Sequence, residues 1–133
     1  MPIFNCSPPV RAGVARSVQL IVHGALVPLV VRSDSGAEAK LQAKIDTGSE
    51  YTVIEEDLAK QLQLVEIDQA TINTVGQQQI VLTVYRAELE IPPLGIREWG
   101  KVLGGVVTLL GREQLRECEL SYSGPSGIVT LRK

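Results

Sequence analysis

The sequence predicts a mainly β protein: a small closed β-barrel with one or two short helices and one lobe per chain. Three observations predict it. The 133 residues suffice for one compact domain, and 44% of them are hydrophobic against 21% charged, so a single core can be buried. Apolar runs that alternate with polar residues recur along the chain. Glycine and proline separate these runs, and segments with helical periodicity are few.

The first third of the chain predicts an arm followed by strands. Residues 1–14 contain three prolines, which disfavour a helix, so we expect an extended arm along a sheet edge. Residues 15–133 are expected to form the domain proper. Two apolar runs flank His23 and Gly24, where we expect a tight turn. The predicted strands are residues 18–22, 25–31 and 39–45, and a second turn is predicted at residues 33–36.

The rest of the chain predicts a helix, a long hairpin and a closing pair of strands. Acidic residues followed by leucines four apart predict a helix over residues 55–62. Two alternating runs meet around Gly76, whose backbone freedom suits a hairpin turn. The remaining predictions are hairpin strands at 70–74 and 79–91, a break at 92–95, one apolar strand at 102–110, a short helix at 113–118, and strands at 118–122 and 128–131.

A short polar motif stands at the end of the third predicted strand: Asp46, Thr47, Gly48 and Ser49. A strand end packed on the core would hold the Asp46 carboxylate in place, and Gly48 would let a second chain or a substrate come close. The hydroxyl groups of Thr47 and Ser49 could fix the loop by hydrogen bonds. The Asp-Thr-Gly tripeptide alone is common in ordinary turns, so its context decides its meaning.

That context is a second motif further along the chain, in which Leu109 and Leu110 are followed by Gly111 and Arg112 at the start of a predicted helix. With both motifs present, the chain resembles the retropepsin-like aspartic peptidases, the single-domain, retroviral type. The order of parts is similar over roughly residues 15–132: strand, Asp-Thr-Gly turn, glycine-tipped hairpin, apolar strand, short helix and final strand. The resemblance implies a barrel of the acid-protease type.

The resemblance also implies a role for each matching residue. Asp46 would be catalytic, Thr47 would clasp the turn of an opposing subunit, and Gly48 would line the cleft. Arg112 would pair with Glu50, where the family more often has an aspartate. The hairpin tip would be a flap that closes over a bound peptide; its residues are Val75, Gly76 and Gln77.

One catalytic carboxylate per chain implies a homodimer. Aspartic proteolysis needs two carboxylates that share a proton, one acting as a base on water and the other as an acid toward the peptide carbonyl. Two copies on a twofold axis would bring their Asp46 side chains together. We expect an endopeptidase acting on peptide or protein substrates, with no metal or other cofactor. A hydrogen bond from Ser49 to the Asp46 carboxylate would favour activity at mildly acidic pH.

Other interpretations are weaker. Asp34, Ser35 and Gly36 form a similar motif, but it lies only twelve residues before Asp46, which leaves no room for a second lobe, so we expect an ordinary hairpin turn. His23 is the only histidine, which argues against a histidine triad or a metal cluster. Trp99 is expected to pack in the core or at an interface. The remaining alternative is a dimeric peptide-binding or assembly module with little turnover.

Composition bounds the partners and the compartment. The net charge of -2 and the scattered basic residues argue against nucleic acid as a partner. Cys6 and Cys118 are the only cysteines, and we expect two free thiols, the first in a frayed terminus, and a reducing, cytoplasmic compartment. The apolar stretch at residues 18–31 is interrupted by His23, Gly24 and Pro28 and is shorter than the ~20 residues of a membrane span, so no membrane association is expected.

Overall fold

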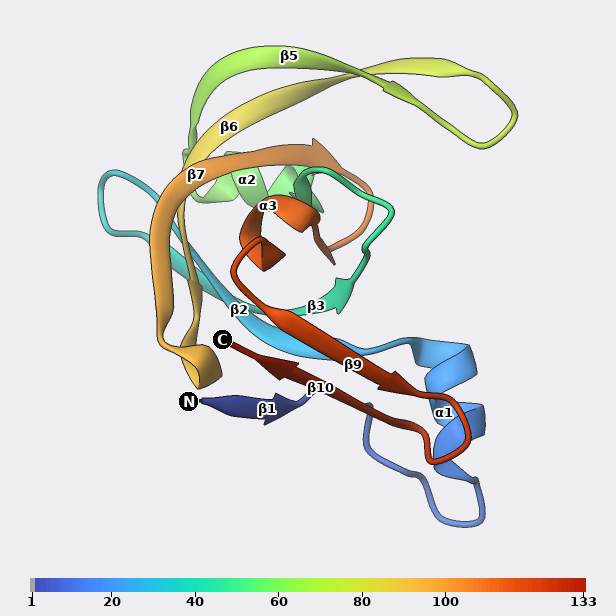
Figure 1. Ribbon diagram of the computed structural model, residues 1–133. Coiled ribbons are helices and arrows are strands. Elements are labelled where there is room, and N and C mark those ends of the chain that lie inside the picture. The colour runs from blue at the N-terminus through green and yellow to red at the C-terminus, as the bar shows by residue number, and fades with distance from the viewer. Residues whose placement is uncertain (1) are drawn as a thin grey trace.

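The computed structural model describes residues 2–133, and its strands form a seven-stranded sheet and a smaller three-stranded sheet (Figure 1). Residue 1, the first of the predicted arm, lies outside the described residues. The elements are β1 (Ile3–Asn5), α1 (Arg16–His23), β2 (Leu26–Arg32), β3 (Glu38–Ile45), β4 (Thr52–Glu55), α2 (Glu56–Gln61), β5 (Val65–Asn73), β6 (Gln79–Ile91), the 3-10 helix η1 (Pro92–Leu94), β7 (Ile96–Gly105), β8 (Leu109–Leu110), α3 (Arg112–Leu115), β9 (Glu119–Ser123) and β10 (Ile128–Arg132).

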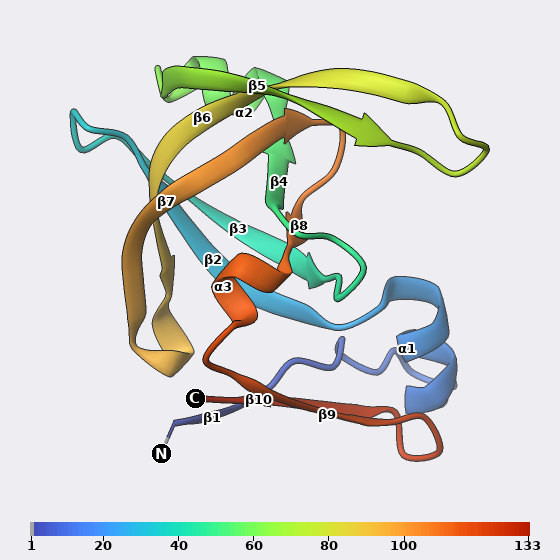
Figure 2. The same ribbon diagram turned by 45° about the horizontal axis from the view of Figure 1, so that its top comes forward.

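The seven-stranded sheet closes into a barrel. Its order is β2–β3–β8–β4–β7–β6–β5, and β2 also pairs with β6, so the sheet curls round on itself (Figure 2). Closure buries Val27, Leu29 and Val31 on the inner face of β2 and joins β2 to β6 at the seam. The largest fully buried side chains include Leu29, Ile54, Tyr85, Leu89, Ile91 and Leu110. The predicted fold class, a mainly β barrel with one lobe, is confirmed.

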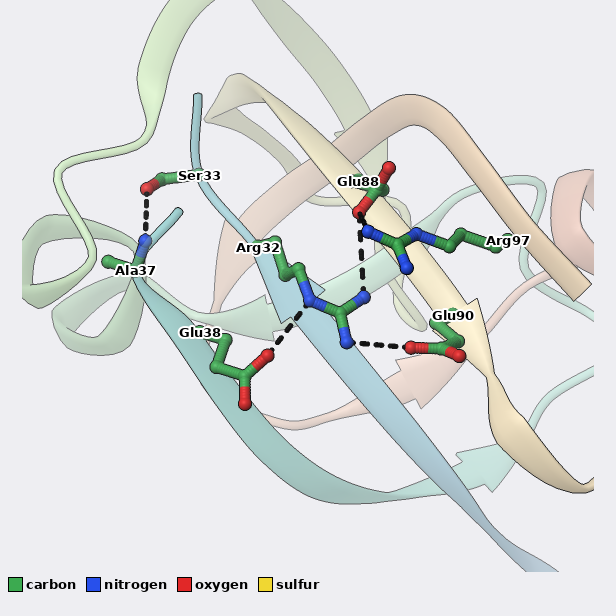
Figure 3. A network of polar contacts seen from close by, with 7 residues as sticks. All are labelled: Arg32, Ser33, Ala37, Glu38, Glu88, Glu90 and Arg97. Atoms are coloured by element: carbon green, nitrogen blue, oxygen red, sulfur yellow. Dashed lines mark hydrogen bonds and ion pairs between the residues drawn. The ribbon is translucent and has the colours of Figure 1, made fainter. Parts of the chain in front are cut away.

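A polar network spans the seam between β2 and β6 (Figure 3). The Arg32 guanidinium forms ion pairs of 2.8 Å with Glu38 and 2.7 Å with Glu90. It also lies 3.5 Å from Glu88, which forms a 3.0 Å ion pair with Arg97. Three carboxylates are therefore balanced by two guanidinium groups that link β2, β3, β6 and β7.

The predicted strand over residues 18–22 is wrong, because these residues lie in helix α1. Leu20 is buried, whereas Val18, Ile21 and Val22 are exposed, so the segment needs only one apolar face. The N–H of Gly24, at φ 69°, donates to the Leu20 carbonyl and ends the helix. A helix satisfies its own backbone hydrogen bonds, so this segment needs no partner strand. With α1 there are three α-helices rather than one or two.

The predicted single strand over residues 102–110 is two strands, β7 and β8. The break falls at residues 106–108, where Val106 is 88% exposed. The two strands have different partners: β7 runs between β4 and β6, whereas β8 runs between β3 and β4. The chain must bend to pass from one place in the sheet to the other. The helix predicted over residues 55–62 and the hairpin around Gly76 are confirmed as α2 and as β5 with β6.

The N-terminal arm is extended, and its strand β1 pairs with β10 (Figure 1). Cys6 does not lie in a frayed terminus, because it is fully buried and its thiol donates to the Val129 carbonyl at 3.2 Å. Both cysteines are free, as predicted. Trp99 is not in the core: it is 44% exposed, and the guanidinium of Arg86 lies 4.3 Å from its ring centre. Within residues 2–133, no helix has the length and apolar character needed to span a membrane.

Candidate active site

The Asp46 turn begins where β3 ends, and a neighbouring strand fixes it. β3 and β8 run parallel, with Ile45 opposite Leu110, and the N–H of Asp46 donates to the Leu110 carbonyl at 3.0 Å. The turn itself closes through the Ser49 N–H, which donates to the Asp46 carbonyl at 3.2 Å. Figure 2 shows the end of β3 beside β8 and α3. Two motifs far apart in the sequence thus form one structural unit.

Gly48 contacts the Asp46 carboxylate through its backbone. Its N–H donates to Oδ1 of Asp46 at 2.9 Å, which holds one oxygen of the partly buried carboxylate within the turn. A Cβ at this position would lie 3.1 Å from the same oxygen, closer than most contacts of that kind. Glycine therefore allows the turn to fold tightly against its own aspartate.

Helix α3 supports the turn from beneath. The Arg112 guanidinium donates to the Thr47 carbonyl at 2.8 Å, and the Arg112 N–H donates to the Ser49 carbonyl at 2.8 Å. The Glu113 N–H donates to the Glu50 carbonyl at 3.1 Å. Three donors at the start of α3 thus bind three successive parts of the loop, which leaves the Thr47 side chain exposed at the surface.

Gly111 allows this close approach. A Cβ there would lie 2.3 Å from the Tyr51 carbonyl oxygen, so no larger residue fits without moving the backbone. The Gly111 N–H donates at 3.1 Å to the hydroxyl of buried Thr52, and that hydroxyl donates to the Gln114 side chain. The glycine of the second motif is therefore required by packing between two backbone segments rather than by its own dihedral angles.

Two predicted interactions at the site are wrong. Arg112 does not pair with Glu50 within the described residues, because its guanidinium is engaged by the Thr47 carbonyl. Glu50 instead lies beside the Tyr51 hydroxyl, and its charge is the main cause of a raised Tyr51 pKa. The Ser49 hydroxyl donates to the Tyr51 carbonyl at 2.7 Å and not to the Asp46 carboxylate, so the expected reason for an acidic pH optimum is not present in the subunit.

A cleft of about 590 Å³ opens beside the Asp46 turn. One wall is the loop from Gly48 to Tyr51, and the other is the hairpin strand β5 together with Leu82. Its floor is apolar, formed by Val53, Leu103 and Leu109. Leu109, from the second motif, therefore lines the cleft, whereas Leu110 is buried behind it.

The tip of the β5–β6 hairpin is a tight turn that projects beyond the barrel (Figure 1). The Thr74 N–H donates to the Gln78 carbonyl at 2.8 Å, and the Gln77 N–H donates to the Thr74 carbonyl at 3.0 Å. Gly76 and Gln77 have positive φ angles of 92° and 65°, and Val75 is fully exposed. The three predicted tip residues thus lie at the hairpin turn, and Val75 makes no contact with the cleft walls.

Several site residues carry no sequence signal that would single them out. Thr52 and Gln114 are polar residues in the middle of otherwise ordinary segments, and they are found only because both are buried and joined. Tyr51 lines the cleft, and the sequence offers only its position beside the first motif. Among residues 2–133, no group of three or more potential metal ligands lies together.

Comparison with known proteins supports the fold through structure alone. No family model and no curated protein matches the chain. The EIAV protease complexed with the inhibitor HBY-793 is similar at a TM-score of 0.51 and 15% identity, over 83% of this chain and 93% of that one. The foamy viral protease-reverse transcriptase bound to double-stranded DNA is similar at a TM-score of 0.52 and 19% identity. That match covers 73% of this chain and 16% of the viral chain.

The barrel, its Asp46 turn and these structural neighbours together define the fold class: the chain has the retropepsin-like fold that its two motifs predict. Because the identities are low, this likeness concerns architecture. The chain spans only 16% of the length of the foamy viral chain.

Proposed function

We propose that this chain is one subunit of a homodimeric aspartic endopeptidase in which Asp46 of each copy supplies half of the catalytic pair. One arrangement carries the proposal. The Asp46 carboxylate stands on a turn held by β8 and α3, beside a cleft of about 590 Å³ with an apolar floor, in a retropepsin-like barrel. A turn fixed by this many hydrogen bonds is suited to positioning a reacting group.

The mechanism requires two such turns to meet. Two carboxylates close together share one proton, because both cannot ionise comfortably at short distance. The ionised member takes a proton from a water molecule, whose oxygen attacks the peptide carbonyl carbon, while the protonated member donates to the carbonyl oxygen. Proton transfer to the amide nitrogen then breaks the carbon–nitrogen bond. The Thr47 side chain beside each Asp46 is exposed and would contact its counterpart in the partner subunit.

The cleft indicates what kind of substrate fits. β5 is the last strand of its sheet, so its outer edge is unpaired among the described strands and is able to hydrogen-bond an extended peptide. Apolar side chains of such a peptide would pack on Val53, Leu103 and Leu109. The turn at Val75, Gly76 and Gln77 would act as a flap by moving toward the bound peptide.

The test compares two aspartates of the same chain. Wild type, Asp46→Asn and Asp34→Asn are incubated with a denatured protein at mildly acidic pH, and the fragments are identified by mass spectrometry. Asp46→Asn should lower the cleavage rate about 1,000-fold or more, because half of the proton-transfer machinery is lost. Asp34→Asn should cleave like wild type, since Asp34 lies in an exposed turn away from the cleft.

Cleavage by Asp46→Asn at the wild-type rate would contradict the proposal. A wild type that dimerises and binds denatured peptides without cutting them at any pH would instead support a dimeric peptide-binding module. Because each of the two variants loses only one carboxylate charge, circular dichroism should show the same β-rich spectrum for both variants and the wild type.

A further inference from the structure

The proposed function requires two copies of the chain to meet at Asp46, and the three-stranded sheet indicates the surface they use. In this sheet β1 pairs with β10 of its own chain, with Phe4 opposite Leu131, and β9 pairs with the other edge of β10. Both edges of β10 are therefore occupied within one subunit. The N-terminal strand fills its own sheet and is not left available to a partner.

β9 carries an unpaired edge. The order β1–β10–β9 places it last in the sheet, and no other described strand lies on its outer side. Two apolar side chains of β9 are also exposed to solvent. On the face of the sheet where Val129 and Leu131 of β10 are buried, the neighbouring Leu120 and Tyr122 of β9 are 39% and 64% exposed. An exposed apolar edge strand of this kind is a template for pairing with another chain.

A hollow connects this edge to the Asp46 turn. It has a volume of about 270 Å³ and lies between α3 and the sheet. Its lining includes Thr47 of the Asp46 turn and Leu120 of β9, together with Leu115 and Cys118. The surface that would have to be covered for two Asp46 turns to meet is thus continuous with the unpaired edge of β9.

We propose that the second copy pairs with β9 along this edge, antiparallel and about a twofold axis at Ser121, to give a six-stranded sheet in the order β1–β10–β9–β9–β10–β1. In this register, the side chains of β9 suit those of β9 in the second copy. Leu120 lies opposite Tyr122 of the partner subunit, so the two exposed apolar residues cover each other. Glu119 lies opposite Ser123 of the partner subunit and is already paired with Arg132 at 3.2 Å, so like charges do not meet.

This arrangement rests on the proposed dimeric function. It differs from an exchange of N-terminal strands between subunits in the position that it gives to β1. In a sheet built by exchange, β1 would leave β10 and enter the partner's sheet. In the arrangement proposed here, β1 lies at the outer edges of the six strands, far from the twofold axis. Substitutions on β1 and on β9 therefore separate the two possibilities.

The first test is a cross-link. Cross-strand residues on an antiparallel pair have Cα atoms about 4.5–5.5 Å apart, within the range that a disulfide spans. In a Cys118→Ser background, Ser121→Cys should form a covalent dimer under mild oxidation, measured on a non-reducing gel. Ser126→Cys, an exposed residue in the β9–β10 turn, is the matched control and should remain monomeric on the same gel.

The second test compares the two outer strands of the three-stranded sheet. Leu120→Lys should weaken dimerisation at least about tenfold in sedimentation equilibrium, since two lysines would be placed close to the twofold axis. Ile3→Lys, which changes a 60% exposed residue on β1, should leave the dimer constant unchanged. Circular dichroism checks that both variants remain folded.

The outcomes distinguish this surface from the proposed activity. A cross-linked Ser121→Cys dimer with no peptidase activity would support dimerisation through β9 and would contradict the proposed peptidase activity. An active, dimeric wild type in which Ser121→Cys fails to cross-link, or in which Ile3→Lys dissociates the dimer and Leu120→Lys does not, would overturn the surface and leave the peptidase standing.

Discussion

Two turns of this chain have nearly the same sequence and different structures. Asp34-Ser35-Gly36 and Asp46-Thr47-Gly48 each follow a strand of the barrel. The first is a surface hairpin between β2 and β3, closed by the Ser33 N–H and the Ala37 carbonyl at 2.9 Å (Figure 3 shows the Ser33 hydroxyl binding the Ala37 N–H). The second is bound by β8 and α3, which come from the far end of the chain.

The two glycines differ in the same way. Gly36 has a φ of 90° and open space where a Cβ would be, so it serves the conformation of the turn. Gly48 has no such angle, and its missing Cβ makes room for the Asp46 carboxylate. The comparison teaches that the tripeptide becomes a candidate active site through its tertiary supports.

The largest effect is expected beneath the Asp46 turn. Gly111→Ala would place a Cβ 2.3 Å from the Tyr51 carbonyl, so the backbone must move and the free energy of unfolding should fall by about 3 kcal/mol. Chemical denaturation measures this loss. Gly36→Ala is the matched control and should cost about 1 kcal/mol through its positive φ. A Gly111→Ala protein as stable as Gly36→Ala would show that the contact is not rigid.

The next effect separates activity from stability. Gly48→Ala should lower the rate of peptide cleavage about 10- to 100-fold, because the new Cβ at 3.1 Å displaces the Asp46 carboxylate. Its unfolding free energy should change by less than about 1 kcal/mol. Gly36→Ala should show the reverse, with a measurable loss of stability and unchanged cleavage. Equal activity of the two variants would remove Gly48 from the site.

Arginines contact both turns. Arg112→Met removes the donor to the Thr47 carbonyl, and we expect a loss of about 1–2 kcal/mol in unfolding free energy together with weaker dimerisation. Arg86→Gln breaks an exposed ion pair with Asp34 and should cost no more than about 1 kcal/mol. Sedimentation and denaturation measure the two quantities. If Arg86→Gln also weakened the dimer, the two turns would not be independent.

The smallest effect concerns acid. The hydrogen bond from the Arg97 guanidinium, together with the charge of Arg32, lowers the pKa of Glu88 below the ordinary glutamate value of 4.5. A carboxyl group with a lowered folded-state pKa contributes stability that is present above pH 4.5 and is lost as the pH falls through the folded value. Glu88→Gln should therefore flatten the dependence of melting temperature on pH below 4.5. An unchanged acid slope would show that the network in Figure 3 is not linked to folding.

The sequence predicts the barrel and the Asp46 turn because both depend on local patterns. Alternating runs such as residues 79–91 specify strands, and Asp46 with Leu110 and Gly111 specifies the turn and its support. Residues 18–22 form a helix although an isolated run rich in valine and isoleucine suits a strand. What favours the helix is that only Leu20 packs on the core while Val18, Ile21 and Val22 are exposed, which the sequence pattern does not reveal. The partners of Arg112 and Ser49 depend on sub-ångström placement of a loop, which no spacing encodes.

The central claim is that each chain holds half of an active site, and subunit mixing tests it most directly. Wild type and Asp46→Asn are mixed in varying proportions at constant total concentration, allowed to exchange, and assayed for cleavage of a denatured protein. If both carboxylates are needed, a mixed dimer is inactive and the rate falls as the square of the wild-type fraction. A rate that falls in direct proportion to the wild-type fraction would contradict the claim, because each chain would then act alone.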